Sequence, residues 1–271
     1  MHYEEYLRTQ NVHHTGSAAP MVDSDFYANL NRIATRRQAV LAEIARMAVK
    51  KSSPLDQAVV RGLDILFGVL GLLVCAIPLL VIATAIKIDS PGTIFFRQAR
   101  VGKGRKVFQI IKFRSMRQNA ESVTGPCWAT PNDPRLTAVG AFLRRTKLDE
   151  LPQLFNILMG KMTFVGPRPE RPEFVCRFVR YMPAFDRRHD VKPGLTGLAQ
   201  LRNGYDDSAE SVYRKLYWDA QYLKRRSLQT DISILRHTVK AVLQGLTKAA
   251  GDTCEMRVDL DVSPILNLLS E

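Results

Sequence analysis

Two adjacent carboxylates, Asp149 and Glu150, are candidate chemical groups, because cations and a hydroxyl precede them and an apolar helical pattern surrounds them. The helical spacing is carried by four apolar residues, Leu148, Leu151, Phe155 and Leu158. Pro152 fits a helix only in its first turn, where the missing N–H has no intrahelical partner. We therefore expect both acids at a helix N-terminus, where unpaired N–H groups and the helix dipole favour anions. This position suits a metal-bound phosphate, or a carboxylate kept ionised to attack one. The alternative is that the two acids only complement the dipole.

A second candidate is Arg168, which lies between Pro167 and Pro169. The two prolines stiffen the turn, so the guanidinium is presented at a low cost in conformational entropy. One interpretation is bidentate binding of a phosphate. The other is a structural ion pair with an acid such as Glu170.

A run of cations adds to this pattern. Residues 97–117 contain eight Lys and Arg residues and no acid, and they include Lys112 and Arg114. We expect these cations to face lipid head groups or a phosphorylated substrate. The alternative is a solvated strand face, although such a face usually mixes both signs of charge. Gly102 and Gly104 do not have the spacing of a phosphate-binding loop.

The whole chain is also basic, with 39 Lys and Arg residues against 26 acids among 271 residues, a net charge of +13. This excess indicates a polyanionic partner, which could be nucleic acid, an anionic membrane or a phosphorylated substrate. The four cysteines are far apart and form no C-x-x-C pair, so neither zinc nor a disulfide framework is indicated. The first ten residues lack an apolar stretch, and we expect no cleavable secretory signal.

Residues 65–86 form an uncharged run of 22 residues, long enough to cross a bilayer. Pro78 lies inside the run and removes one backbone hydrogen bond, which should bend the helix. Both flanks are basic, and basic flanks stay on the cytoplasmic side of a membrane. A proline-broken, re-entrant helical hairpin satisfies both observations. The alternative is a kinked helix that crosses the membrane once.

The remaining patterns outline a small α+β domain. Alternating residues predict strands at 93–97 and 107–111, joined as a hairpin, and a short strand at 162–165. Helical periodicity predicts helices at 139–145, 209–223 and 228–246. Residues 1–22 are aperiodic and are expected to be disordered. Residues 25–51 predict a basic amphipathic helix, which we expect on a membrane surface rather than packed on the protein body.

A second loop rich in glycine and proline, residues 189–200, carries a cation, Lys192, and a hydroxyl, Thr196. His189 has no neighbour at a metal-ligand spacing and is expected to be structural. An aromatic stripe in the helix at 209–223 is typical of a buried core face, although it also suits a membrane interface. Residues 247–271 carry little signal.

Five motifs in order resemble those of the bacterial sugar transferase family, the monotopic phosphoglycosyl transferases. They are Arg-Gly-Leu-Asp at 61–64, Lys-Phe-Arg-Ser-Met at 112–116, Leu-Asp-Glu-Leu-Pro-Gln-Leu-Phe-Asn-Ile-Leu at 148–158, Met-Thr-Phe-Val-Gly-Pro-Arg-Pro at 162–169 and Pro-Gly-Leu-Thr-Gly-Leu-Ala-Gln at 193–200. The resemblance covers about residues 59–246.

This resemblance implies a phosphosugar transfer from a UDP-sugar to undecaprenyl phosphate, with Mg²⁺ and release of UMP. It assigns the attack on phosphorus to Asp149, through an aspartyl-phosphosugar intermediate, and it gives Glu150 a metal or proton role, so that both acids are candidate metal ligands. Arg144, Arg168, Lys112, Arg114 and Lys192 become candidate phosphate-binding residues. The product would start exopolysaccharide, capsule or O-antigen assembly at the cytoplasmic face of the bacterial inner membrane.

The expected fold is therefore a membrane-associated α+β protein with four parts. These are an N-terminal extension (1–52), a re-entrant membrane helix broken at Pro78 (53–90), a mostly helical cytoplasmic catalytic domain with a short β-hairpin (91–246) and a C-terminal tail (247–271). Expected partners are the UDP-sugar, undecaprenyl phosphate and inner-membrane lipid, with homo-oligomerisation left open. A non-enzymatic membrane-anchored scaffold is the first alternative. A nucleic-acid binder is the second, but no helix-turn-helix or RNP-like pattern appears, so no nucleic-acid partner is expected.

Overall fold

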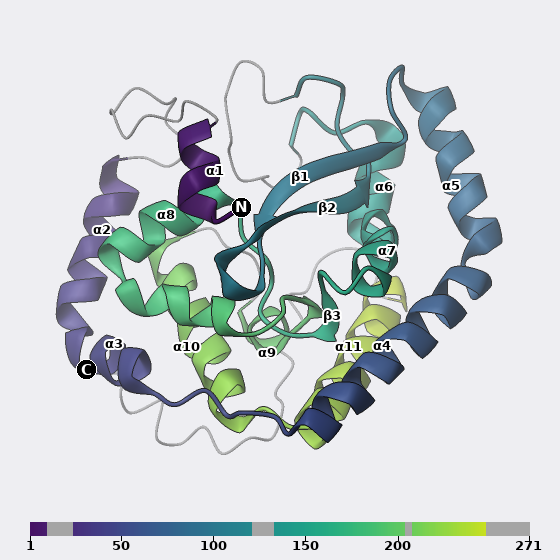
Figure 1. Ribbon diagram of the computed structural model, residues 1–271. Helices are drawn as coiled ribbons and strands as arrows, with labels where there is room; N and C mark the ends of the chain where they lie inside the picture. Colours follow the sequence, from purple (N-terminus) through teal and green to yellow (C-terminus); the bar gives the residue numbers. More distant parts are fainter. Residues whose placement is uncertain (10–23, 121–132, 204–207, 248–271) are drawn as a thin grey trace.

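The structure is a computed structural model, and it describes residues 1–9, 24–120, 133–203 and 208–247 (Figure 1). Helices dominate, and two small two-stranded sheets accompany them. This confirms the α+β class and the short β-hairpin expected from the sequence. The C-terminal tail at 248–271 lies outside the described residues.

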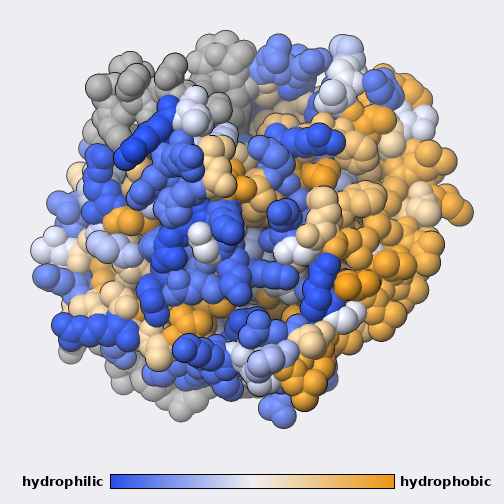
Figure 2. Space-filling model, in the orientation of Figure 1, coloured by the Kyte–Doolittle hydropathy of each residue, from blue (hydrophilic) through white to orange (hydrophobic). Residues whose placement is uncertain are grey.

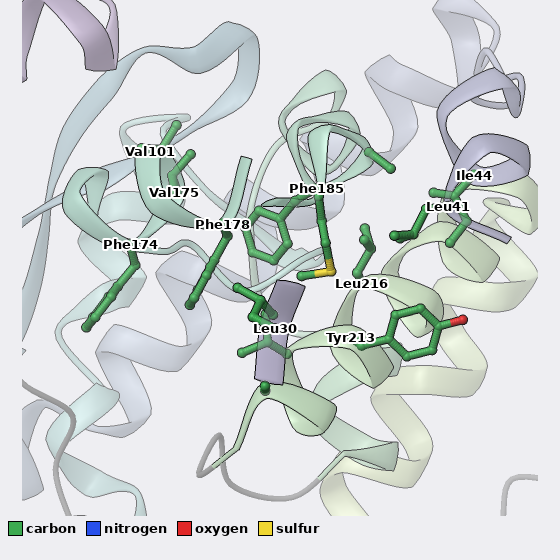
Figure 3. Close-up of a cluster of buried hydrophobic side chains, with 14 of the residues drawn as sticks. Leu30, Leu41, Ile44, Val101, Phe174, Val175, Phe178, Phe185, Tyr213 and Leu216 are labelled. Atoms are coloured by element: carbon green, nitrogen blue, oxygen red, sulfur yellow. The ribbon is translucent and has the colours of Figure 1, made fainter. Parts of the chain in front are cut away.

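The N-terminal region packs on the protein body. It forms α1 (Tyr3–Thr9), α2 (Ser24–Arg36) and α3 (Gln38–Arg46) (Figure 1). The first two pack on α8 (Pro172–Tyr181), α2 also packs on α10 (Ala209–Arg225), and α3 packs on the 3₁₀ segment η3 (Pro183–Asp190). Leu30 and Phe185 are both fully buried in the largest hydrophobic cluster, together with Leu41 and Ile44 (Figure 3).

Two expectations for this region were therefore wrong. The expectation of disorder for residues 1–22 is contradicted at residues 3–9, which form a helix because Tyr3 and Leu7 bury their side chains in the same cluster. The rest of that range, from residue 10, lies outside the described residues. The basic amphipathic segment turns its apolar face to the core of this protein rather than to a membrane surface, and it breaks into two helices at Arg37. Amphipathicity shows that a helix has one apolar face, but it does not identify the surface that covers it.

The apolar run folds as two helices that meet in a bend at Cys75. The first, α4, is Pro54–Val74, begun by a capping box on Ser53, and the second, α5, is Ala76–Asp89. Pro78 has no N–H to offer the carbonyl of Val74, so the ladder of i→i−4 bonds cannot pass through this point. By length and composition, α4 is the only helix among the described residues that could cross a membrane.

The bend projects away from the body, while both outer ends return to it (Figure 1). Near the bend, Val74, Ile77 and Leu80 each expose about 70% or more of their surface. This apolar surface forms the continuous orange side of the molecule in Figure 2. Elsewhere, α4 packs on α7 (Gln153–Leu158) and α5 packs on α6 (Ala138–Thr146).

The hairpin follows directly, with β1 (Phe95–Val101) antiparallel to β2 (Val107–Phe113). Its strands pair Phe95 with Phe113 and Val101 with Val107, around a short 3₁₀ turn, η1 (Lys103–Arg105). The structure therefore confirms the predicted hairpin, although β1 extends further along the chain than predicted.

Three short elements then carry the candidate acids and Arg168. They are α6 (Ala138–Thr146), the 3₁₀ turn η2 (Leu148–Glu150) and α7 (Gln153–Leu158). The following strand, β3 (Thr163–Val165), pairs in parallel with β4 (Gly194–Thr196). The sequence predicted β3 but described the region of β4 only as a loop, because a three-residue strand has too little periodicity to be recognised.

The remaining helices complete the body. They are α8 (Pro172–Tyr181), the 3₁₀ segment η3 (Pro183–Asp190), α9 (Leu198–Arg202), α10 (Ala209–Arg225) and α11 (Leu228–Thr247). The predicted helices at 209–223 and 228–246 are confirmed. Tyr213 and Tyr222 are buried, so the aromatic stripe of α10 belongs to the core. His189 is buried against Asp186, in agreement with a structural role.

Candidate functional site

The two acids lie in the turn η2, which connects α6 to α7. Lys147 adopts a left-handed conformation, with a φ of 61°, and ends α6. The chain then forms 3₁₀ hydrogen bonds from Glu150 to Lys147 and from Leu151 to Leu148. An i→i−4 bond at Pro152 is excluded because proline has no N–H. The expectation of one α-helix through both acids was therefore wrong, since α7 begins only at Gln153.

Glu150 is bound by two cations. Lys112 Nζ lies 2.7 Å from Glu150 Oε1, and the guanidinium of Arg168 reaches both carboxylate oxygens, at 2.5 and 3.3 Å. Burial alone would raise the pKa of Glu150, but the charges of Arg168 and Lys112 hold it well below its ordinary value. Glu150 is therefore an ionised carboxylate with its charge compensated.

Asp149 is held differently. It is 6% exposed, and among the described residues its carboxylate has neither a hydrogen bond nor an ion pair. Burial raises its pKa, the charge of Lys112 counters this shift, and the negative charge of Glu150 adds to it. Of the two adjacent acids, Asp149 thus keeps its oxygens available for a reacting group.

Lys112 is positioned by a fully buried side chain, Asn156 on α7. The Asn156 amide donates to the carbonyl of Gln109 at 2.7 Å and accepts from the N–H of Ile111 at 2.9 Å. These two bonds attach α7 to the middle of β2. They place Lys112, one residue further along β2, against the turn that carries Glu150.

Arg168 follows the strand β3, and its turn is held by β4. The N–H of Gly166 donates to the carbonyl of Thr196, and the N–H of Gly194 donates to the carbonyl of Pro167. A side chain at position 166 would collide with the backbone of Lys192, which is a reason for glycine there. The guanidinium of Arg168 pairs with Glu150 rather than with Glu170, the acid that the sequence suggested as a structural partner.

Arg144, the third cation near the acids, projects from the last turn of α6. Its Nε donates to Ser115 Oγ at 3.1 Å, and its charge counteracts the rise in the pKa of Asp149. The structure therefore brings together five of the predicted site residues: Asp149, Glu150, Lys112, Arg144 and Arg168.

Arg114 lies elsewhere. Its guanidinium is buried at the C-terminal end of α5, where it donates to the carbonyls of Ile86, Ser90 and Pro91. Helix C-termini leave carbonyls without partners, and a buried arginine can satisfy several of them. This geometry supports a structural role, in place of the phosphate contact inferred from the resemblance.

Lys192 is also separate from the acid pair. Burial lowers its pKa, and the charges that affect this pKa most are those of Arg61 and Asp64 on α4. Its neighbours therefore belong to the junction of α4 with the body. The structure gives no contact between Lys192 and the two acids.

That junction contains two residues for which the sequence alone suggested no contact. Arg61 donates to the carbonyls of Ile157 and Leu158 at the end of α7, at 2.7 and 2.6 Å. The buried carboxylate of Asp64 accepts from Thr163 Oγ1 and from the N–H of Phe164. In the sequence these two residues stood out only as the ends of the Arg-Gly-Leu-Asp motif at 61–64, which did not identify partners about a hundred residues away.

No group of three or more His, Cys, Asp or Glu side chains that could hold a metal occurs in the described part of the chain. The site offers a smaller donor set, in which Asp149 has open oxygens and Glu150 is already paired. Mg²⁺ is commonly held by one or two carboxylates together with substrate phosphates. The residues present fit that pattern, with Asp149 as the available protein ligand.

Comparison with known proteins places the site in a family context. The sequence model described as "Bacterial sugar transferase" matches residues 55–245, which include every residue of the site. A UDP-N-acetylgalactosamine-undecaprenyl-phosphate N-acetylgalactosaminephosphotransferase of Aeromonas hydrophila is 42% identical over 193 residues, which are 71% of this chain and 45% of the relative.

Two further relatives differ in length. A UDP-glucose:undecaprenyl-phosphate glucose-1-phosphate transferase of Xanthomonas campestris pv. campestris is 42% identical over 167 residues, covering 61% of this chain and 34% of the relative. The exopolysaccharide production protein PSS of Rhizobium leguminosarum bv. phaseoli is 40% identical over 194 residues, covering 70% and 97%. The chain thus spans less than half of the first two relatives and nearly all of the third.

Proposed function

The chain belongs to the bacterial sugar transferase family, and on this premise we propose that it transfers a sugar phosphate from a UDP-sugar to undecaprenyl phosphate, releasing UMP. The names of two relatives, from Aeromonas and Xanthomonas, contain both the UDP-sugar and undecaprenyl phosphate. The relative from Rhizobium is named an exopolysaccharide production protein, which supports a role of this transfer in exopolysaccharide production.

One observation carries the proposed mechanism: of two adjacent acids, only Asp149 keeps an unpaired carboxylate. A carboxylate oxygen of Asp149 attacks the phosphorus that bears the sugar. A new P–O bond forms, the bond from that phosphorus to the oxygen bridging to UMP breaks, and the electron pair leaves with UMP. Carboxylates are established nucleophiles of this kind.

The second step reverses the exchange. An oxygen of undecaprenyl phosphate attacks the same phosphorus, and the bond between that phosphorus and Asp149 breaks. The carboxylate is regenerated, and the lipid carries the sugar through a diphosphate. No oxidant or reductant is needed, and the two steps together conserve all three phosphate groups, one in UMP and two in the lipid-linked diphosphate.

The neighbouring charges give each residue a role. Arg168 and Lys112 compensate Glu150 in the absence of substrate, so they can also stabilise charge on the phosphate oxygens as the reaction proceeds. Arg144 lies close enough to Asp149 to influence its pKa and can contact the same phosphate. Glu150 keeps these cations in place and can accept or return a proton.

Mg²⁺ is part of the proposal. When bound between Asp149 or Glu150 and the diphosphate, the cation would neutralise phosphate charge and polarise the bond that breaks. Orientation of the substrate phosphates falls to Arg168 and Lys112, whose positions are fixed by their ion pairs with Glu150.

We further propose that α4 and α5 form a re-entrant hairpin in the cytoplasmic leaflet of the bacterial inner membrane. The exposed apolar bend at Cys75 supports insertion, and the two outer ends support re-entry. Arg61 fastens α4 to α7, and Arg114 fastens the end of α5 to the segment that follows β2. Because both ends are attached to one compact body, that body and both helix ends belong on the same side of the membrane.

The test is to incubate the purified full chain with a panel of UDP-sugars, undecaprenyl phosphate and Mg²⁺. The expected result is release of UMP with at least one sugar, together with a lipid-linked diphosphosugar detected by mass spectrometry. Parallel reactions without Mg²⁺ or without lipid separate the metal requirement from the acceptor requirement. Release of UDP instead of UMP, or a lipid without the second phosphate, would contradict the proposal.

A further inference from the structure

The turn that presents Arg168 is held almost entirely through its carbonyl groups, because Pro167 and Pro169 have no N–H to donate. Each of the four carbonyls from Pro167 to Glu170 has a donor. These donors are the N–H of Gly194, Arg188 Nη2, Arg100 Nη1 and the N–H of Val101, at distances of 2.9–3.0 Å. The position of Arg168 therefore depends on residues from three other parts of the chain: β4, η3 and the end of β1.

Of these four donors, Arg188 is the one that binds Arg168 itself, because its Nη2 donates to the Arg168 carbonyl at 2.9 Å. The Arg188 side chain is 2% exposed and stacks on Phe185, with 4.6 Å from its guanidinium carbon to the ring centre. The same nitrogen, Nη2, lies 2.8 Å from Asp219 Oδ2 on α10. This nitrogen of Arg188 thus donates a hydrogen bond to the Arg168 carbonyl and forms an ion pair with Asp219.

Asp219 is buried, 1% exposed, and far from the acid pair in sequence. A buried carboxylate is costly unless it is paired. Burial raises the pKa of Asp219 to about 6, so the group is ionised at neutral pH, when its attraction for Arg188 is strongest. The hydrophobic contacts of α10 alone give no reason for an acid at this position.

The charge balance of the surrounding network depends on Asp219. In the described part of the chain, three cations, Arg100, Arg188 and Lys215, lie around the two carboxylates of Glu170 and Asp219. Lys215 Nζ lies 2.7 Å from Glu170 Oε1. Arg188 is 3.7 Å from the same oxygen, and Arg100 is 3.8 Å from the other oxygen, Oε2. Without the charge of Asp219, Arg188 would be drawn towards Glu170 and away from the carbonyl of Arg168.

We propose that Asp219 is a positioning residue for the reaction, acting through Arg188 on the backbone of Arg168. The chain of contacts runs from Asp219 to Arg188, to the Arg168 carbonyl and, through the Arg168 side chain, to Glu150. Asp219 touches neither substrate nor the reacting atoms. This inference rests on the proposed function, because it concerns how Arg168 is held for that reaction.

The test is a double-mutant cycle in the full chain, using the rate of UMP release by wild type, Asp219→Asn, Arg168→Ala and the double variant. A shift of about 1 Å in a positioned group costs on the order of a hundredfold in rate, so we expect Asp219→Asn to lose about tenfold or more. In the Arg168→Ala background, the same substitution should cause no further loss, because the group that it positions is gone. An equal loss in both backgrounds would overturn the proposal.

Asp231→Asn is the matched control. Asp231 is also a buried acid whose pKa burial raises to about 6, but it pairs with the hydroxyl of Tyr222 and not with Arg188. The Asp231→Asn variant should release UMP at nearly the wild-type rate per folded molecule. Thermal unfolding compares the folding of all variants. If wild type itself releases no UMP, the proposed function fails, and the double-mutant cycle has no rate to compare.

A second measurement does not depend on turnover. Hydrogen exchange of peptides spanning residues 166–171 should be faster in Asp219→Asn than in wild type, and unchanged in Asp231→Asn. Unchanged exchange in Asp219→Asn, at wild-type turnover, would assign Asp219 a role in stability alone and overturn the proposal.

Discussion

Arg168 and Glu150 form a two-pronged ion pair, with N···O distances of 2.5 and 3.3 Å, although 18 residues separate them in the chain. The planar guanidinium matches both carboxylate oxygens, a geometry that an ammonium cannot reproduce. This pair keeps Glu150 occupied and leaves Asp149 as the acid with open oxygens. The division of roles between the two acids follows from it.

The first prediction separates those roles. Incubation with a UDP-sugar and Mg²⁺, without lipid, should leave wild type carrying a phosphosugar on Asp149, detected by intact mass and peptide mapping. Asp149→Asn should lose both the adduct and turnover, because an amide is not a competent nucleophile here. Glu150→Gln should be slowed but still form adduct. An adduct mapped to Glu150 would exchange the two roles.

The second prediction concerns pH. The attack needs Asp149 ionised, and burial raises the pKa of that carboxyl. The rate of UMP release should therefore fall as the pH is lowered through a midpoint above about 4, the ordinary value for aspartate.

Glu150→Gln tests the cause of this shift, because the charge of Glu150 contributes to the rise. Its removal should move the midpoint of the pH–rate profile to lower pH. A wild-type midpoint below the ordinary value, or a shift to higher pH in Glu150→Gln, would contradict the assignment.

The third prediction concerns the fork of Arg168. Both Arg168→Ala and Arg168→Lys should lose turnover, since removal of one positioned donor costs on the order of a hundredfold in comparable sites. The matched control is Arg180→Lys on α8, which is exposed and should be neutral. Wild-type turnover by Arg168→Lys would show that charge suffices and that the two-pronged geometry is not required.

The fourth prediction tests the structural role of Arg114. Arg114→Ala leaves the carbonyls at the end of α5 without their donor, and we expect a loss of about 2–3 kcal/mol in unfolding free energy. Chemical denaturation measures the loss, and the exposed Arg97→Ala on β1 is the control. If Arg114→Ala instead keeps its stability and raises the KM for the UDP-sugar, Arg114 binds phosphate.

The fifth prediction concerns membrane topology. In a cysteine-free background, two variants introduce single thiols at exposed positions: Lys51→Cys, before α4, and Lys240→Cys, on α11. In sequence, the first precedes the apolar helices α4 and α5 and the second follows them. Neither should react with a membrane-impermeant thiol reagent in intact cells, and both should react after lysis. Labelling of only one in intact cells would establish a helix that crosses the membrane.

Pro78→Leu provides a matched variant for the same assay. It restores the N–H that could bond the carbonyl of Val74, so a continuous helix becomes available through the bend. We expect one of the two positions to become accessible in part of the population. Unchanged protection would show that the contacts of Arg61 and Arg114 with the body suffice for re-entry.

The sequence predicted those features that depend on neighbours along the chain. The β-hairpin, the helices α6, α10 and α11 and the break near Pro78 each follow from local periodicity or from the chemistry of proline. It did not predict α1 or the packing of α2 and α3 on the body. An apolar helix face is evident from the sequence, but the surface that covers it is chosen by the rest of the fold.

The same distinction holds for the site. From residue types and order, the sequence by itself determined that Asp149 and Glu150 form an acid pair and that a proline-stiffened arginine follows them. Only the tertiary structure decided that Arg168 and Lys112 pair with Glu150, that Arg114 caps α5 and that Lys192 lies beside α4. All four cations carry the same charge, so their roles are set by distance, and the distances come from contacts between residues far apart in the chain.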